Sequence, residues 1–282
     1  MMHPSDGSGG ESVYEEAIVI IVRPGEHSIH CIGCPRVALI QILLNRAGNT
    51  LKVDGDFGGK TRAAVVNFKR SHGLPRDPVV GPHTWRKFPL GDNTKVVDVV
   101  DIGDPVMSGS RIHSLRQAGG NPIRLGLMCA GVEQMVTDVI RQAGSYGKVA
   151  LLRITGHGNL GRWFTVSVGD VVDSKPKDQK VLATEYHSYI DWGHIDELAP
   201  TLSRLKGYFA PYGMMEHHGC SLGSRMHTRL LMHRLADLWG VPVSAGVGMQ
   251  YGALYFDGQF FTAYPNHGTL ETWSKQFRDA CY

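Results

Sequence analysis

The sequence predicts an α/β domain with a mainly parallel sheet and flanking helices, preceded by a small all-α module. Two observations predict this arrangement. Residues 35–90 carry apolar residues at helical spacing, divided by Gly-containing turns. Over residues 95–282, runs of branched apolar residues alternate with helical patterns, and this βαβ order is typical of parallel sheets with crossover helices.

The first 34 residues are expected to form a tail with one short strand. Residues 1–12 are rich in Gly, Ser and Asp, a composition typical of disorder, whereas residues 17–22 are apolar and predict the strand. No basic segment precedes that strand, so we expect no standard secretory signal. No apolar run approaches the roughly 20 residues of a membrane span, so no such span is expected.

The five cysteines are an odd, dispersed set, and the sequence therefore predicts no disulfide framework. Cys31 and Cys34 form a single C-x-x-C pair. Because no second pair accompanies it, a local disulfide or two free thiols before a helix is favoured over a zinc or redox site.

Three helices are predicted in the all-α module. Residues 36–47 carry apolar side chains at helical spacing and end at Gly48; residues 62–71 follow Thr61, which can cap them, and end at Gly73. A third, short helix begins near Pro82, because proline is favoured in the first turn of a helix.

A set of residues spread along this module carries a family resemblance: Leu44-Asn45, Val53-Asp54-Gly55-Asp56-Phe57-Gly58, Thr61, Ala64-Val65, Phe68, His72-Gly73-Leu74, Val80-Gly81-Pro82 and Thr84-Trp85. With these residues, the run 37–88 resembles the small three-helix peptidoglycan-binding domain found at the ends of many bacterial cell-wall hydrolases. The resemblance implies that the module binds peptidoglycan, with a surface near Phe57, Arg62 and Trp85. Most of the matching residues are structural in the family, so a packing role is expected for the two aromatic rings.

The module is basic, with ten Lys and Arg against three Asp between residues 35 and 88, or +7. The whole chain is +3, which leaves −4 for the rest. A basic module beside a mildly acidic domain indicates that the module meets an anionic polymer. Nucleic acid is not the expected polymer, because aromatic and Arg residues are not interleaved and no nucleic-acid motif is recognised.

The elements of the second domain follow from its apolar runs. Strands are expected at residues 95–102, 125–129, 149–155, 208–215 and 241–246, helices at 132–143, 196–205, 225–239 and 269–280, and a hairpin at 253–264. Residues 103–121 and 159–180 show no regular pattern.

A cysteine and a histidine are expected to meet at one edge of this sheet. Cys220 lies in the small-residue turn after one predicted strand, and His157 lies in the Gly-His-Gly turn after another. Neighbouring parallel strands that end in these turns would place thiol and imidazole side by side. A cysteine nucleophile needs a base, and a backbone N–H at the start of a helix favours thiolate and can hold an oxyanion.

The motifs around these turns resemble a caspase-like fold, a clan of cysteine peptidases. The matching residues are Gly156-His157-Gly158, His218-Gly219-Cys220-Ser221-Leu222-Gly223, Leu235-Ala236 and Gly240-Val241-Pro242-Val243-Ser244-Ala245. The resemblance implies Cys220 as nucleophile, His157 as general base, and backbone N–H groups of Gly158 and the Gly219-Cys220 turn as the oxyanion hole. It implies no metal and no cofactor. The residues around the cysteine of true caspases are absent, so aspartate specificity is not implied.

Other chemistry stays open. A zinc site has candidate ligands in His157, His194, His217, His218, Asp191 and Cys220. No H-E-x-x-H is present, however, and the adjacent His217 and His218 would point to opposite faces of a strand. A glycosidase would use Glu216 or Glu133 together with an Asp, but the sequence shows no catalytic spacing for such a pair. A non-catalytic wall-binding protein is a further alternative.

The predicted function is hydrolysis, by Cys220 and His157, of an amide bond in the cell wall or in a wall-associated protein. Without a standard signal, the protein is expected to be made in the cytoplasm and to reach the wall by non-classical export, as a secreted antibacterial effector or a lysin. The expected partners are peptidoglycan and an immunity protein or secretion apparatus.

Overall fold

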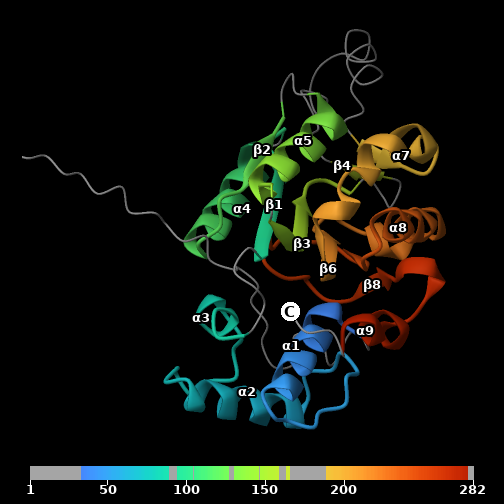
Figure 1. The fold of residues 1–282 in the computed structure, drawn as a ribbon. Helices are drawn as coiled ribbons and strands as arrows, with labels where there is room; N and C mark the ends of the chain where they lie inside the picture. The colour runs from blue at the N-terminus through green and yellow to red at the C-terminus, as the bar shows by residue number, and fades with distance from the viewer. Residues whose placement is uncertain are drawn as a thin grey trace, which may run out of the picture.

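The computed structural model describes residues 33–88, 94–103, 105–126, 130–145, 147–158, 163–165 and 189–278. A six-stranded sheet forms its centre, with helices on both faces (Figure 1). The strand predicted at 17–22 lies outside the described residues, as do Cys31 and most of residues 159–180. Cys34 is a buried free thiol.

The six strands run in the order β2-β1-β3-β6-β7-β8. Neighbours are parallel from β2 to β7, and β8 is antiparallel to β7. The bounds are β1 (Thr94–Asp101), β2 (Ile123–Leu125), β3 (Lys148–Thr155), β6 (Phe209–His217), β7 (Val243–Gly246) and β8 (Phe260–Ala263), with a separate antiparallel pair of β4 (Trp163–Thr165) and β5 (Tyr189–Asp191). The prediction of a mixed α/β fold with a mostly parallel sheet is confirmed.

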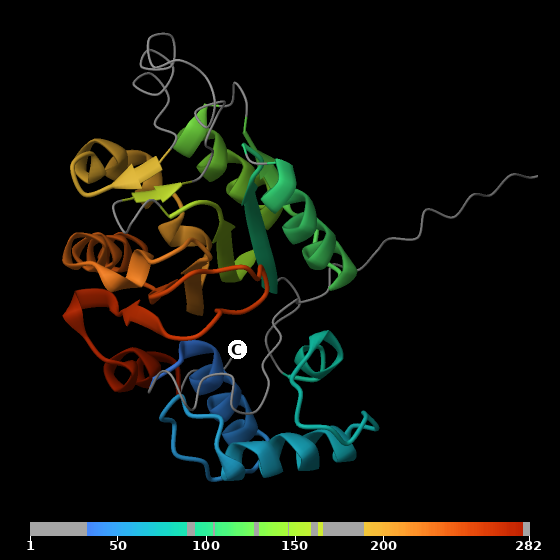
Figure 2. The same ribbon diagram turned by 180° about the vertical axis from the view of Figure 1, so that it is seen from behind.

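Helices cover both faces of this sheet, as two opposite views show (Figures 1 and 2). Two cores lie on the two faces of the sheet, and Met214 and Met215 of β6 point into different ones, because neighbouring residues in a strand point to opposite faces. Met215 packs in the core beneath α5, α7 and α8, whereas Met214 packs in the core beneath α1 and α9. The bounds of these helices are α1 (Pro35–Arg46), α5 (Gly131–Ala143), α7 (Ile195–Ser203), α8 (Met226–Trp239) and α9 (Leu270–Arg278).

Helix α1 belongs to the predicted module, yet it also packs on the sheet. Its residues from Pro35 to Leu44 are all buried, and a helix buried all round has partners on more than one side. One apolar cluster joins α1 to Phe57, Phe68 and Trp85 of the module and to side chains of β3 and β6. The helical module, completed by α2 (Gly59–Ser71) and α3 (Pro82–Trp85), therefore shares a continuous core with the α/β domain.

A buried ion pair fixes the same contact. Arg36 of α1 donates from two nitrogens to both carboxylate oxygens of Glu216 on β6, and its third nitrogen donates to the Leu254 carbonyl at 3.0 Å. Glu216 also accepts from His218 Nε2 at 3.0 Å. Burial disfavours the charged form of Glu216, but the Arg36 charge and the hydrogen bonds from His218 and Arg36 outweigh burial and hold the pKa of this carboxyl below its ordinary value.

Two local predictions are wrong. Residues 105–117, expected to be irregular, form helix α4 (Pro105–Gln117), whose serines and Gly109 weaken the helical signal and whose described core contacts are made by Ile112 and Leu115. The expected hairpin at 253–264 does not form, because β8 pairs with β7. The Asp-Gly step at Asp257, which would form the turn of that hairpin, is used differently: Asp257 accepts hydrogen bonds from the N–H groups of Tyr251 and Gly252.

Of the described helices, none is both long enough and apolar enough to cross a membrane.

Candidate active site

The two predicted turns lie side by side at the carboxyl edge of the sheet. Strands β3 and β6 are parallel neighbours, with Ile154 paired to His217, and the His218 N–H donates to the Ile154 carbonyl at 2.8 Å. The turns that follow, with His157 and Cys220, therefore leave the sheet next to each other. This edge is where α/β folds commonly place their chemistry.

The backbones of the two turns are in contact. A Cβ added to Gly158 would lie 2.1 Å from the Cys220 carbonyl oxygen and 2.8 Å from its nitrogen, far inside van der Waals distance. Only glycine fits at residue 158. The described structure thus brings the turn of His157 and Gly158 against the turn of Cys220.

The cysteine is partly exposed and faces a third loop. Gln250 donates its backbone N–H to Cys220 Sγ at 3.4 Å, and the thiol faces the Gln250 carbonyl at 3.8 Å. The next residue, Ser221, has φ of 59° and donates its N–H to the Gly248 carbonyl at 2.8 Å. Sequence reasoning did not single out Gln250, because the segment between β7 and β8 comes to the cysteine from about 30 residues away along the chain.

The helix after the cysteine begins within one residue of its predicted start, and a short segment separates it from the thiol. A short 3₁₀ turn, Leu222–Ser224, follows Cys220, and α8 begins at Met226. The N–H groups of the first turn of α8 therefore belong to residues well past the thiol. The hydrogen bond to Sγ comes from the Gln250 backbone instead.

The two predicted oxyanion glycines differ in exposure. Gly158 is half-buried, whereas Gly219 is buried, and a Cβ there would lie 2.9 Å from the His217 ring and from Leu222. Gly219 is therefore required by packing, and Gly158 lies nearer to solvent.

The residues considered for zinc lie in different surroundings. His194 pairs with Asp191 at 2.8 Å near the start of α7, and His218 is fully buried against Glu216 and stacks on Phe256. His217 packs beside Leu222 and Gly219. Within the described ranges, no three His, Cys, Asp or Glu side chains are grouped to hold a metal ion.

The carboxylates considered for a glycosidase are both engaged in ion pairs. Glu216 is buried against Arg36, and Glu133 is half-exposed and pairs with Arg204. Glu133 also accepts a hydrogen bond from Thr201 at 3.0 Å.

The predicted wall-binding residues are placed unequally. Phe57 and Trp85 are 2% and 1% exposed and build the core, as their packing role predicted, whereas Arg62 is exposed. A cavity of about 210 Å³ lies beside the start of α2, lined by Gln41, Leu51, Lys52, Asp54, Asp56, Gly58, Gly59, Lys60 and Thr61. The Asp-Gly and Gly-Gly steps of the sequence indicate turns in this loop, but they do not predict a cavity.

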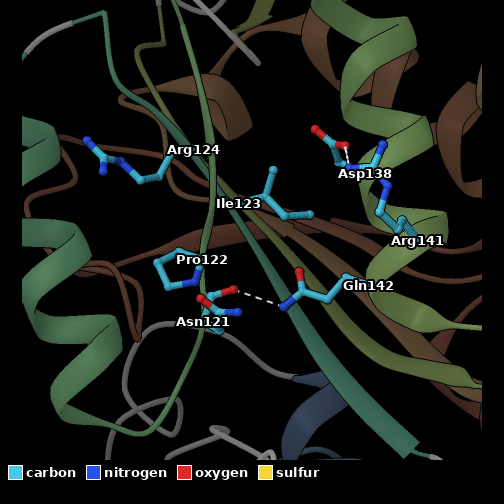
Figure 3. Close-up of a pocket in the computed structure, with 7 residues that line it drawn as sticks. All are labelled: Asn121, Pro122, Ile123, Arg124, Asp138, Arg141 and Gln142. Atoms are coloured by element: carbon cyan, nitrogen blue, oxygen red, sulfur yellow. Dashed lines mark hydrogen bonds and ion pairs between the residues drawn. The ribbon is translucent and has the colours of Figure 1, made fainter.

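A second hollow, of about 320 Å³, lies at the edge strand β2 (Figure 3). It is lined by Asn121, Pro122, Ile123, Arg124, Asp138, Arg141 and Gln142. Arg141 pairs with Asp138 at 2.6 Å, and Gln142 donates to the Asn121 carbonyl at 2.9 Å. No residue predicted for the active site lines it.

Comparison with known proteins places the module in a family. Residues 35–88 match the family of putative peptidoglycan binding domains. The chain carries a peptidoglycan-binding domain. This finding confirms the predicted N-terminal peptidoglycan-binding module.

Two curated relatives are named as an amidase and a carboxypeptidase. The chain is 30% identical over 141 residues to the N-acetylmuramoyl-L-alanine amidase CwlM of Mycobacterium tuberculosis. The aligned region covers 45% of this chain and 34% of the relative. The chain is 32% identical over 84 residues to the zinc D-Ala-D-Ala carboxypeptidase of Streptomyces albus G, covering 30% of this chain and 25% of the relative. The chain thus spans about a third or less of the length of each.

A solved structure of a peptidoglycan-binding protein from Clostridioides difficile shares 35% identity over 24% of this chain and 40% of that chain, with a TM-score of 0.22.

Proposed function

We propose that this protein is a peptidoglycan-targeted cysteine hydrolase that cleaves an amide bond of the cell wall or of a wall-associated protein. The contact between the Gly158 and Cys220 backbones carries the proposal, because it brings the two loops together with a partly exposed thiol at the carboxyl edge of the sheet. The peptidoglycan-binding domain and the likeness to wall amidase and carboxypeptidase sequences support the substrate class.

The proposed reaction assigns a role to each residue of the edge. His157 removes the thiol proton, and Cys220 Sγ attacks the carbonyl carbon of the amide. The N–H groups near Gly158 and the Gly219-Cys220 turn stabilise the negative oxygen. His157 then protonates the leaving nitrogen as the C–N bond breaks. Water, deprotonated by His157, attacks the thioester, and the thiol is restored with release of the acid.

Digestion of purified sacculi tests the proposal. The wild type should release soluble fragments with new amino termini, identified by mass, and Cys220→Ala should release none. Cys34→Ala is the matched control, because Cys34 is a buried thiol whose burial raises its pKa to about 12. It should digest like the wild type if it folds equally well.

Other outcomes would replace the cysteine mechanism. Release by Cys220→Ala that a chelator abolishes would point to a zinc enzyme, and new reducing sugar ends would point to a glycosidase. Pelleting with sacculi without any release would leave a wall-binding protein.

We also propose that the protein acts at the wall, outside the cytoplasm, as an antibacterial effector or lysin. Fractionation of producing and target cells tests this location: detection in the producer's cytosol alone, with no lysis of any target, would contradict it. Co-purification from the producer would identify an immunity protein.

A further inference from the structure

Arg111 donates to the backbone carbonyls of one residue beside His157 and one residue that faces Cys220. It is carried by α4 and is 4% exposed. Its Nη2 donates to the Gln250 carbonyl at 3.0 Å, and its Nη1 donates to the Gly156 carbonyl at 3.5 Å. Gly156 directly precedes His157, and Gln250 faces the Cys220 thiol. One guanidinium thus joins the turn that carries His157 to the Gln250 loop, which faces the Cys220 thiol.

The Gln250 backbone presents opposite dipoles to the sulfur. Its carbonyl oxygen suits the protonated thiol, which can donate to it, and its N–H suits the thiolate, which accepts. A carbonyl oxygen repels a thiolate. Because Arg111 binds that oxygen, it draws charge away from the sulfur side and adds a cation close to the site. Both effects favour the thiolate.

Arginine suits this position because its planar guanidinium group can donate to two acceptors at once. A buried cation costs free energy that an apolar side chain of the same size does not. An arginine that binds the Gly156 and Gln250 carbonyls places its charge beside the turn of His157 and the loop that faces Cys220.

We propose that Arg111 is a positioning residue of the active site that holds the Gly156 and Gln250 carbonyls in place and favours the reactive thiolate of Cys220. The inference rests on the proposed function for its biological meaning. The thiol's reactivity can be measured without any substrate.

Other charged or titratable groups surround the same loops. His157 follows β3, and His217 of β6 lies beside Gly219. Asp257 binds the N–H groups of Tyr251 and Gly252 just after Gln250, and Arg229 of α8 donates to the Gly223 carbonyl at 2.8 Å.

The test is alkylation of the folded full chain by iodoacetamide between about pH 6 and about pH 10, with Cys220 modification followed by mass spectrometry of its peptide. Arg111→Met should react about tenfold more slowly than the wild type at the acid end, the lower bound for losing a nearby opposite charge. The two rates should converge at the alkaline end. Arg111→Lys, which keeps a cation, should fall between them.

Arg116→Met is the matched control, because Arg116 is an exposed arginine of the same helix. It should react like the wild type. If Arg111→Met does not fold by circular dichroism, Arg111→Lys and Arg111→Gln carry the comparison, and Gln should react more slowly than Lys at the acid end only.

Two results would overturn the proposal. Wild-type rates in the Arg111 variants at every pH would show that Arg111 does not act on the thiol. An equal slowing at every pH would show a role in packing alone. If the slowing occurs only at the acid end while Cys220→Ala still digests sacculi, the Arg111 inference stands and the proposed function fails.

Discussion

Replacing Arg36 by methionine should destabilise the whole protein, although Arg36 belongs to the peptidoglycan-binding domain. The Arg36 and Glu216 side chains are 1% and 5% exposed, and they form a two-pronged ion pair. Removing one partner of a buried pair leaves a charge without compensation, which costs about 3–5 kcal/mol. Methionine keeps most of the side-chain volume, so the loss reports on charge and hydrogen bonds.

The structure also predicts how this loss depends on pH and on a second substitution. In Arg36→Met, Glu216 can relieve the penalty by taking up a proton, so the loss should be smaller at about pH 5 than at about pH 7. Arg36→Met with Glu216→Gln should regain much of the stability, because Gln is neutral and can still accept from His218.

Urea unfolding followed by tryptophan fluorescence measures both effects. Trp85 reports on the module, and Trp239 and Trp273 report on α8 and α9. Because the two units share one core, a single transition is expected. Arg62→Met, on the exposed surface of α2, is the control and should change stability by less than about 0.5 kcal/mol.

Three outcomes would refute this reasoning. A loss below about 1 kcal/mol in Arg36→Met would show that the pair is not buried as described. Additive effects in the double variant would show that the two side chains do not interact. Two separate transitions would show that the module folds independently of the sheet.

Three further predictions concern acid stability, wall binding and the active-site loops. Burial lowers the pKa of His218, and Arg36 holds the pKa of Glu216 low, so both groups bind more protons in the unfolded chain. The melting temperature, measured by calorimetry, should therefore fall as pH drops below about 6.5. Lys60 lines the cavity at α2, so Lys60→Glu should weaken pelleting with sacculi without changing the melting temperature. Trp85 is buried in the core, so Trp85→Ala should lower the free energy of unfolding in urea by about 3–5 kcal/mol. Gly158→Ala should abolish release from sacculi, because its methyl group drives the two loops apart; wild-type activity would contradict the contact.

The edge of the sheet was predictable from sequence because it depends on local patterns. Branched apolar runs that stop at Gly-His-Gly and His-Gly-Cys identify two strands and their ends, and the βαβ order makes those strands parallel. Their adjacency then follows from the sheet order, with β3 next to β6. Local sequence patterns are therefore sufficient to place the turns of His157 and Cys220 at the same edge of a parallel sheet.

The supporting parts of the site were not predictable, because they depend on contacts between distant segments. Gln250 reaches Cys220 from the loop between β7 and β8, which its own side chain closes by bonding to the Asp257 backbone. The sequence showed an Asp-Gly step there, which ordinarily marks a hairpin. Arg111 was missed for a related reason, since a helix rich in Ser and Gly has a weak helical pattern.

The shared core changes how the peptidoglycan-binding domain is expected to act. A flexible tether raises the concentration of an enzyme near its substrate and leaves the enzyme free to search. Here α1 packs on β3 and β6 and pairs through Arg36 with Glu216, four residues before Cys220. The module and the thiol are therefore held at a fixed distance and angle. Under the proposed function, a wall polymer bound to the module would be cut only where it presents a bond at that offset, and the packing of α1 would contribute to the choice of bond as well as to stability.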